Sequence, residues 1–388
     1  MILRQPLLAV LAVSALSLSS CAQEEPTGVT EEALFARGGK KGGPTPPPVL
    51  ADTTPIIVYG AWHCSDDSCL WGTARDTAEF NEKNHWLVDR GDGSPSVNLV
   101  VLSFVNPLRL LQQTTDAYTL NGVPKGMTRD IVDYFQNAGI RVMLSIGGIT
   151  YVDDWNEALA TNAFQLGLNA AAVAQDLGVG IEIDYEENAD PNLDGLQAFI
   201  DAYRSELPYD ASGNNPAARL TIDLAAGDRW LIALTRHATV HWLDIAKPVL
   251  DYANAMVPNR QPNSAADAIA NWQEHIDGKP RYDPPIQPLA PAKFTGSLYI
   301  VTGQNPAPEC TDFDNSLQKA TGHYVQGALP NPDMPLASPG MLGFMFWAAE
   351  QPSPRRITTA PPNSCEGGVG AGAAHFDIPI PMPALREY

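Results

Sequence analysis

The chain has 388 residues, of which 44% are hydrophobic and 18% are charged. This balance excludes a disordered or coiled-coil protein. There are 24 Lys and Arg residues against 44 Asp and Glu residues, so the formal net charge is -20. An acidic surface repels phosphate backbones, which argues against nucleic-acid binding and favours a neutral or cationic substrate. The 31 Gly and 34 Pro residues predict long, irregular loops.

The N-terminal residues predict export. Arg4 precedes a short apolar stretch at 7–16, and the sequence Leu-Ser-Ser-Cys then ends at Cys21. This order is typical of a signal peptide. A Cys at this place resembles the lipobox of bacterial lipoproteins, which implies a signal peptide at 1–20 and lipidation of Cys21. We therefore expect a lipid-anchored protein of the bacterial cell envelope, at the outer membrane or cell surface. An ordinary signal peptide with a chance Cys is the alternative.

The segment 21–54 is rich in Gly and Pro and includes Gly-Gly-Lys-Lys-Gly-Gly at 38–43 and Pro-Pro-Pro at 46–48. Such a composition cannot build a core, so we expect a flexible tether. The folded domain then covers 55–388 and ends in an irregular C-terminal segment.

Four further cysteines follow Cys21. An even number in an exported chain favours disulfides, and three pairings are possible for Cys64, Cys69, Cys310 and Cys365. Cys64 and Cys69 are near in sequence and are expected to pair, which leaves Cys310 with Cys365. A zinc site is the alternative, but it needs two close cysteine pairs and the sequence has one loose pair. We expect no metal and no other cofactor.

From residue 56 onward, strand and helix patterns alternate. Strands are expected at 56–60, 97–104, 141–146, 180–186, 220–224, 252–256, 297–301 and 343–347, and helices at 128–137, 154–176, 193–206, 242–250 and 265–275. Eight strands with intervening helices predict a single α/β domain, a (β/α)8 TIM barrel. A doubly wound sheet would need a Gly-rich turn after the first strand, which is missing.

The fourth strand carries the strongest chemical signal. Alternation puts acidic side chains on one face and apolar ones on the other: Glu182, Asp184 and Glu186 against Ile181, Ile183 and Tyr185. Active sites of barrels lie at the C-terminal ends of the strands. Three acids this close cannot all ionise cheaply, so at least one pKa is expected to rise. A protonated acid beside a carboxylate is what cleavage of a glycosidic bond requires.

Several segments resemble one family. Ser-Ile-Gly-Gly at 145–148 matches an SxGG motif, 180–186 is similar to DGxDxDxE, and 343–347 resembles an eighth strand that ends in Trp. Together they resemble the family 18 glycoside hydrolases, the chitinase family. The segments 141–148 and 250–259 are closest to the plant and fungal class III enzymes. The resemblance extends from about Ile56 to Trp347.

The resemblance implies a role for each matching residue. Glu186 matches the general acid, and Asp184 matches the carboxylate that orients the N-acetyl group of the substrate. That group is the nucleophile, so the mechanism is substrate-assisted and retaining. Glu182 completes the acidic set. The expected substrate-binding residues are Ser145, Gly147, Gly148, Trp347, Met256, Asn259 and Trp62.

Some positions depart from the family pattern. Glu182 and Val179 each replace an Asp, Pro258 stands where a Tyr donates to the acetamido oxygen, and Met256 replaces a Gln. Tyr185 is expected to face outward, and Tyr252 to lie too deep to replace the missing hydroxyl. Loss of one such donor can cost about 100-fold in rate, so weak turnover is expected.

The expected function is hydrolysis of β-1,4 linkages at N-acetylglucosamine, in chitin or a related glycan. The protein is expected to be a monomer. Two alternatives stay open: an endo-β-N-acetylglucosaminidase on N-glycans, or a catalytically weak barrel that binds glycans. Further aromatic side chains expected near loops would suit a carbohydrate groove: Trp62, Trp71, Trp155 and Trp230. His237 and His241 are four residues apart, but no Glu follows His237 as in a zinc HExxH motif.

Overall fold

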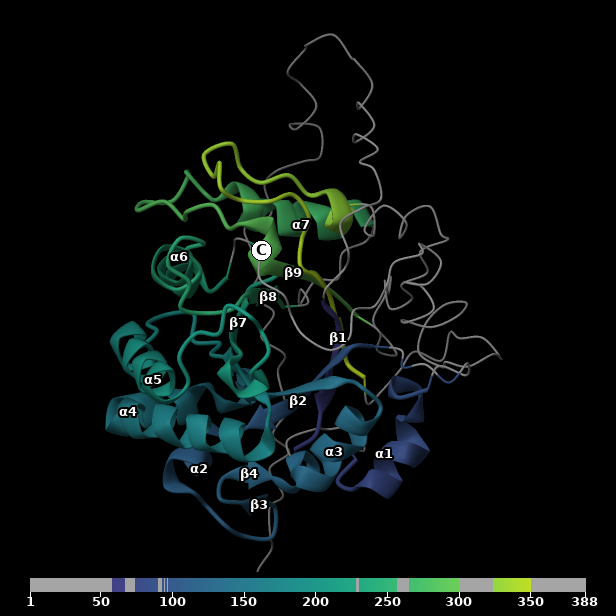
Figure 1. Ribbon diagram of the computed structural model, residues 1–388. Helices are drawn as coiled ribbons and strands as arrows, with labels where there is room; N and C mark the ends of the chain where they lie inside the picture. The colour runs from purple at the N-terminus through teal and green to yellow at the C-terminus, as the bar shows by residue number, and fades with distance from the viewer. Residues whose placement is uncertain are drawn as a thin grey trace, which may run out of the picture. The chain divides into compact units, whose positions relative to one another are not determined.

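The computed structural model describes residues 58–66, 74–89, 93, 95, 97–227, 230–256, 265–299 and 324–349. All of them belong to a compact unit that covers 50–388. Its eight parallel strands close into a barrel in the order β1-β10-β9-β8-β7-β6-β5-β2 (Figure 1). They are β1 Val58–Cys64, β2 Leu99–Val105, β5 Arg141–Gly147, β6 Gly180–Asp184, β7 Leu220–Leu224, β8 Ala253–Ala255, β9 Phe294–Tyr299 and β10 Gly343–Trp347. The expected (β/α)8 barrel is confirmed.

Helices lie between the strands. They are α1 Thr77–Lys83, α2 Pro107–Gln112, α3 Arg129–Asn137, α4 Val152–Leu177, α5 Leu193–Glu206, α6 Ile232–His241 and α7 Ala265–Asp277. Short 3-10 helices are η2 His85–Leu87, η3 Lys125–Met127, η4 Ile149–Tyr151, η5 Pro216–Ala218 and η6 Pro291–Lys293. A small antiparallel hairpin pairs β3 Thr119–Leu120 with β4 Val123–Pro124. Figure 1 shows α4 and α5 side by side, and these two helices pack against each other.

One expected helix is wrong. The segment 242–250 forms turns, and the helix of this region, α6, lies immediately before it. The Asp244 side chain accepts a hydrogen bond from the Ala246 backbone N–H at 2.8 Å, a local turn that competes with a helix. Pro248 also lacks the N–H that a helix needs. The apolar residues of 242–250 therefore pack from turns.

Among the differences between expected and observed strand boundaries, two bear on the site. In the described chain β1 extends to Cys64, four residues past its expected end, so Trp62 lies within a strand and not near a loop. β6 ends at Asp184, so Glu186 follows the strand. Both shifts place side chains at the C-terminal end of the barrel.

Alternation along the strands divides the core in two. The larger apolar cluster lies between strands and helices and includes Ile181, Ile183 and Tyr185. A smaller cluster fills the barrel interior with Val58, Trp62, Leu99, Val101, Met143, Tyr252, Leu342 and Met345. Inward residues further along several strands are polar and buried, as in Ser145 and Glu182. The apolar interior layer therefore supports a polar layer nearer the C-terminal ends of the strands.

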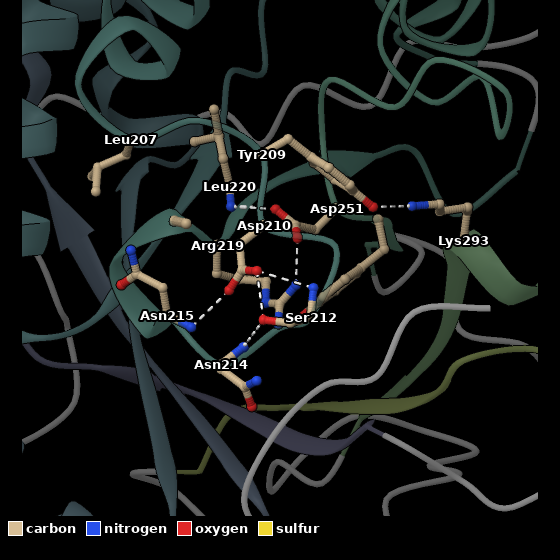
Figure 2. A network of polar contacts seen from close by, with 12 residues as sticks. Leu207, Tyr209, Asp210, Ser212, Asn214, Asn215, Arg219, Leu220, Asp251 and Lys293 are labelled. Carbon is tan, nitrogen blue, oxygen red and sulfur yellow. Dashed lines mark hydrogen bonds and ion pairs between the residues drawn. The ribbon is translucent and has the colours of Figure 1, made fainter.

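A buried ion cluster ties β7 and β8 at the N-terminal end of the barrel (Figure 2). Asp251 accepts hydrogen bonds from Arg219, from Arg204 at 3.1 Å and from the Leu220 backbone N–H at 2.8 Å. Lys293 donates to the Tyr209 hydroxyl at 2.9 Å nearby. The Asp251 carboxylate and the two Arg side chains neutralise one another. The cluster therefore stabilises the fold at the end of the barrel opposite to Asp184.

Several sequence expectations fall outside the described residues. They are the signal peptide, Cys21, the tether, Trp71, Pro258, Asn259 and the cysteines Cys69, Cys310 and Cys365. Cys64 is disulfide-bonded, but its partner is not among the described residues, so the pairings stay predictions. Within the described ranges, no helix combines the length and apolar character needed to span a membrane.

Candidate active site

The acidic residues of β6 project into the barrel as the sequence predicts. Glu182 and Asp184 are buried on the inner side, with Ile181, Ile183 and Tyr185 in the outer core. The Tyr185 hydroxyl contacts Asn156 of α4, which confirms that this tyrosine faces outward. A β-strand with this pattern can place acids in the mouth because its apolar face is held by helices.

Glu182 lies at the centre of a hydrogen-bond chain across the barrel. The Trp62 indole N–H donates to its Oε1 at 2.9 Å, and the Asn254 amide donates to its Oε2 at 2.6 Å. Thr295 in turn donates to Asn254 Oδ1 at 2.6 Å, which fixes the orientation of the amide. Burial raises the pKa of Glu182 to about 6, and the hydrogen bond from Trp62 opposes the rise. The extra methylene of this Glu lets it meet donors from both β1 and β8.

Asp184 ends β6 and is 4% exposed. Its pKa lies well above the ordinary range because of burial first, and then because of the negative charges of Glu186 and Glu182. Its Oδ1 is buried and has no hydrogen-bond partner among the described residues. A substrate donor that reached this oxygen would therefore satisfy an unpaired acceptor.

Glu186 follows the strand and is partly exposed. Burial raises its pKa from the ordinary 4.5 to about 7, against a hydrogen bond from the Ile149 backbone that favours the ionised form. Near neutral pH this side chain therefore exists in both protonation states. That is the property of a group that first donates and then accepts a proton.

Asp223 is a fourth acid that the sequence analysis did not select. It lies on β7, is 2% exposed, and is opposite Asn254 in the strand register. Its carboxyl group hydrogen-bonds with Glu182 and Asn254, and its pKa is well above the ordinary range, chiefly through burial. The signal was present in the sequence, because a polar residue at an alternate position of a buried strand faces inward.

The Gly147-Gly148 pair brings β5 close to β6. A Cβ on Gly147 would lie 1.9 Å from the Asp184 carbonyl oxygen, and the Gly147 φ is 120°. The Gly148 N–H and the Trp155 indole N–H both donate to that same carbonyl oxygen, at 3.0 and 3.1 Å. The two glycines thus allow the backbone approach that fixes Asp184. Ser145 lies beside Glu182 in the register and is fully buried.

Aromatic residues lie at the ends of β10 and β2. Trp347 is partly exposed, and its ring centroid is 5.9 Å from that of Phe104. Phe104 also lies against Gly148, where an added Cβ would be 3.0 Å from the ring. Met256 follows β8 and packs, partly buried, against the outer core cluster. Phe104 therefore contacts both Trp347 and the glycine turn at the end of β5.

Other candidates are structural in their observed contacts. Trp155 was expected near a loop but is fully buried in α4, and its indole N–H bonds to backbone carbonyls. Tyr252 lies deep in the barrel, as expected, with its hydroxyl 3.8 Å from the Met143 sulfur. His237 and His241 stack on α6 with ring centroids 4.4 Å apart. Across the described ranges, no group of three or more His, Cys, Asp or Glu side chains is placed to hold a metal ion.

The assembled site holds several acidic groups that can carry protons in the barrel mouth. Four carboxyl groups from β6, its following loop and β7 share it, and the described cations Arg204 and Arg219 are paired with Asp251 at the other end. Repulsion and burial together keep some of these acids protonated near neutrality. The arrangement suits acid catalysis on an uncharged or cationic substrate.

Comparison with known proteins gives a mixed result. No family model matches the sequence, and no curated protein matches the chain. Among solved structures, it is similar to a GH18 chitinase from Pseudoalteromonas aurantia, with 16% identity, a TM-score of 0.45, and coverage of 64% of this chain and 85% of that one. A chitinase from Bacillus thuringiensis has 11% identity, a TM-score of 0.45, and coverage of 84% and 71%. A class V chitinase from Nicotiana tobaccum has 13% identity, a TM-score of 0.44, and coverage of 82% and 98%.

Proposed function

We propose that the protein is a glycoside hydrolase that cleaves β-1,4 linkages at N-acetylglucosamine in chitin or a related glycan. The observation that carries the proposal is the pairing of Asp184 and Glu186 in the barrel mouth. Burial holds the Glu186 pKa at about 7, and Asp184 has a buried acceptor oxygen without a partner. A proton donor beside a group that can orient an amide is the requirement of substrate-assisted cleavage.

In the proposed reaction Glu186 gives its proton to the glycosidic oxygen, and the leaving sugar departs as an alcohol. The acetamido oxygen of the substrate attacks the anomeric carbon from the other side and forms a cyclic oxazolinium ion. Asp184 orients the acetamido N–H and stabilises the positive charge. Glu186, now ionised, takes a proton from water as the water opens the ring, which restores the acid and retains the anomeric configuration.

A weakly catalytic, glycan-binding barrel is the second candidate. Among tyrosines whose side chains the structure describes, no hydroxyl hydrogen-bonds to Asp184, and Tyr252 and Tyr185 are engaged elsewhere. The residue at the family's tyrosine position, Pro258, lies outside the described residues. Cleavage of the core of an N-glycan by the same chemistry is a third candidate. A test with two substrates distinguishes it from chitin hydrolysis.

The test is hydrolysis of chitin oligomers and of a high-mannose glycoprotein by the wild type and by Glu186→Gln. We expect the variant to lose at least about 100-fold in kcat while glycan affinity is kept, because the amide retains shape but not the proton. Product release from one substrate identifies the glycan class, and binding without release from either supports the glycan-binding barrel.

Asp190→Asn is the matched control for this experiment. Asp190 lies in the same loop, four residues further on, and its side chain is exposed. The control should hydrolyse at the wild-type rate. If Glu186→Gln also does so, Glu186 is not the acid.

We also propose that the chain is exported and anchored in the bacterial cell envelope through a lipid on Cys21. Support comes from the signal-like residues at 1–20 and the Leu-Ser-Ser-Cys sequence. Two or more acyl chains give stable membrane attachment without a spanning helix. The site would then act on glycans outside the cytoplasm, within reach of the predicted tether.

A further inference from the structure

The polar layer of the barrel holds more carboxyl groups than the proposed reaction uses. Glu182 and Asp223 lie on neighbouring strands, are both buried, and hydrogen-bond with each other through their carboxyl groups. Two ionised carboxylates have no proton to share and would repel each other in a site without water. One proton must therefore reside on this pair.

The donors around the pair decide which carboxyl group holds the proton. Glu182 accepts N–H groups on both oxygens, from Trp62 at 2.9 Å and from Asn254 at 2.6 Å. Two such donors favour a carboxylate. Asp223 has fewer N–H donors: the Asn254 amide also hydrogen-bonds to it, but no described donor reaches its Oδ1. The Asn254 amide is oriented by Thr295, which fixes its N–H toward Glu182.

We propose that Asp223 is a positioning residue that remains protonated and donates its proton in a hydrogen bond to the ionised Glu182. The pair then carries a single negative charge. In this state Glu182 keeps its place between β1 and β8, and only one buried charge lies behind Asp184. A second charge on Asp223 would make ionisation of Asp184 more costly.

The groups that face Asp223 are consistent with a proton held there. Glu182 and Asp184 face it from β6, and both carry or can carry negative charge. On its other side β8 presents the neutral Asn254, and deeper in the barrel Tyr252, whose phenol burial keeps protonated. None of the main influences on the Asp223 pKa is a Lys or an Arg.

The location of the proton can be measured without any assay of activity. Difference infrared spectra of the full-length protein at pH 8, above the pKa of about 6 of Glu182, separate the carbonyl stretch of a protonated acid from that of a carboxylate. Asp223→Asn should remove one protonated-acid band, whereas Glu182→Gln should remove one carboxylate band. Asp176→Asn, an exposed residue near the end of α4, is the control for an ordinary carboxylate. Loss of a carboxylate band in Asp223→Asn overturns the proposal.

The consequence for turnover rests on the proposed function, and the pH profile of kcat/KM tests it. The Asn side chain of Asp223→Asn is always neutral and still donates an N–H, so the acid limb of the pH profile should not move. Asp223→Leu lacks the donor, leaves the Glu182 charge less compensated, and should move the acid limb upward by about half a pH unit or more.

The two readouts fail in different ways. If Asp223→Asn moves the acid limb downward, Asp223 is ionised in the wild type and the proposal is wrong. If Asp223→Leu does not fold, Asp223→Asn still decides the question through its spectrum and its profile. If the wild type hydrolyses no glycan, the proposed function fails, while the infrared bands still show where the proton lies.

Discussion

Glu182 shows how one added methylene changes a site. A Glu is one methylene longer than an Asp, and at this position its side chain reaches the indole of Trp62 and the amide of Asn254 together. Both of its oxygens act as acceptors. Side chains of the barrel strands β1 and β8 thus stabilise the charge of Glu182, two residues before Asp184 on β6.

Replacement of this acid tests how much the two acceptors stabilise the fold. In Glu182→Gln the new NH2 group must face either Trp62 or Asn254, both of which donate, so one buried donor loses its partner. We expect a loss of about 1–3 kcal/mol in the free energy of unfolding. Urea titration measures it, with Glu206→Gln at the exposed end of α5 as a control for the exchange of acid and amide. An unchanged midpoint would mean that the two hydrogen bonds contribute nothing to stability.

At the residue scale, the sequence was informative where a pattern repeats. The alternation of acids with Ile181, Ile183 and Tyr185 correctly predicted the inward set, and the depth of Tyr252 was also predicted correctly. Asp223 and Asn254 were missed because neither belongs to a run of alternating acids like that of β6. Their relation to Glu182 depends on the register between β6, β7 and β8, which no local pattern contains.

The element that fixes the geometry of the acids is the junction of β5 and β6. Gly147 has a φ of 120°, and any Cβ there would overlap the Asp184 carbonyl oxygen. The same oxygen receives N–H groups from Gly148 and Trp155. The glycine motif therefore positions the backbone of the neighbouring strand in addition to forming a turn.

Gly147→Ala should prevent normal folding or cost more than about 3 kcal/mol in the free energy of unfolding, since both strain and overlap apply. Gly178→Ala is the matched control. Gly178 also has a left-handed φ, 66°, but an added Cβ there has nothing within 4 Å, so only the strain of about 1 kcal/mol applies. Thermal unfolding of the two variants separates the cost of backbone strain from the cost of steric overlap. Equal losses would show that the β5–β6 contact is not tight.

Elements were predicted well where periodicity was long and poorly where turn chemistry competed. α5 has the predicted bounds, 193–206, because an Asn cap and a 14-residue amphipathic run define it. The segment 242–250 has helix-like apolar spacing, yet Asp244 and Pro248 favour turns. Helix propensity does not show whether the hydrogen bond from the Ala246 backbone to the Asp244 side chain or the short apolar pattern of 242–250 decides the local structure.

At the scale of the whole molecule, the proposed lipid anchor on Cys21 can be tested in cells. Cys21→Ser removes the thiol that a lipid would modify, so the protein should move from the membrane fraction to the soluble fraction when it is expressed in a bacterium. Ser20→Ala keeps a small residue before the Cys and should leave the distribution unchanged. Fractionation and immunoblotting provide the measurement. Persistence of the Cys21→Ser protein in membranes would contradict lipid anchoring.

The closure of the barrel has a consequence for the order of events during synthesis. Val58 at the start of β1 pairs with Gly343 at the start of β10, so the first and last strands of the barrel are neighbours. β1 also pairs with β2, which the ribosome makes soon afterwards, but its other edge stays open until nearly all of the described chain has been made. Contacts so distant in sequence form late. An exported chain would thus cross its membrane before β1 and β10 can pair and close the barrel.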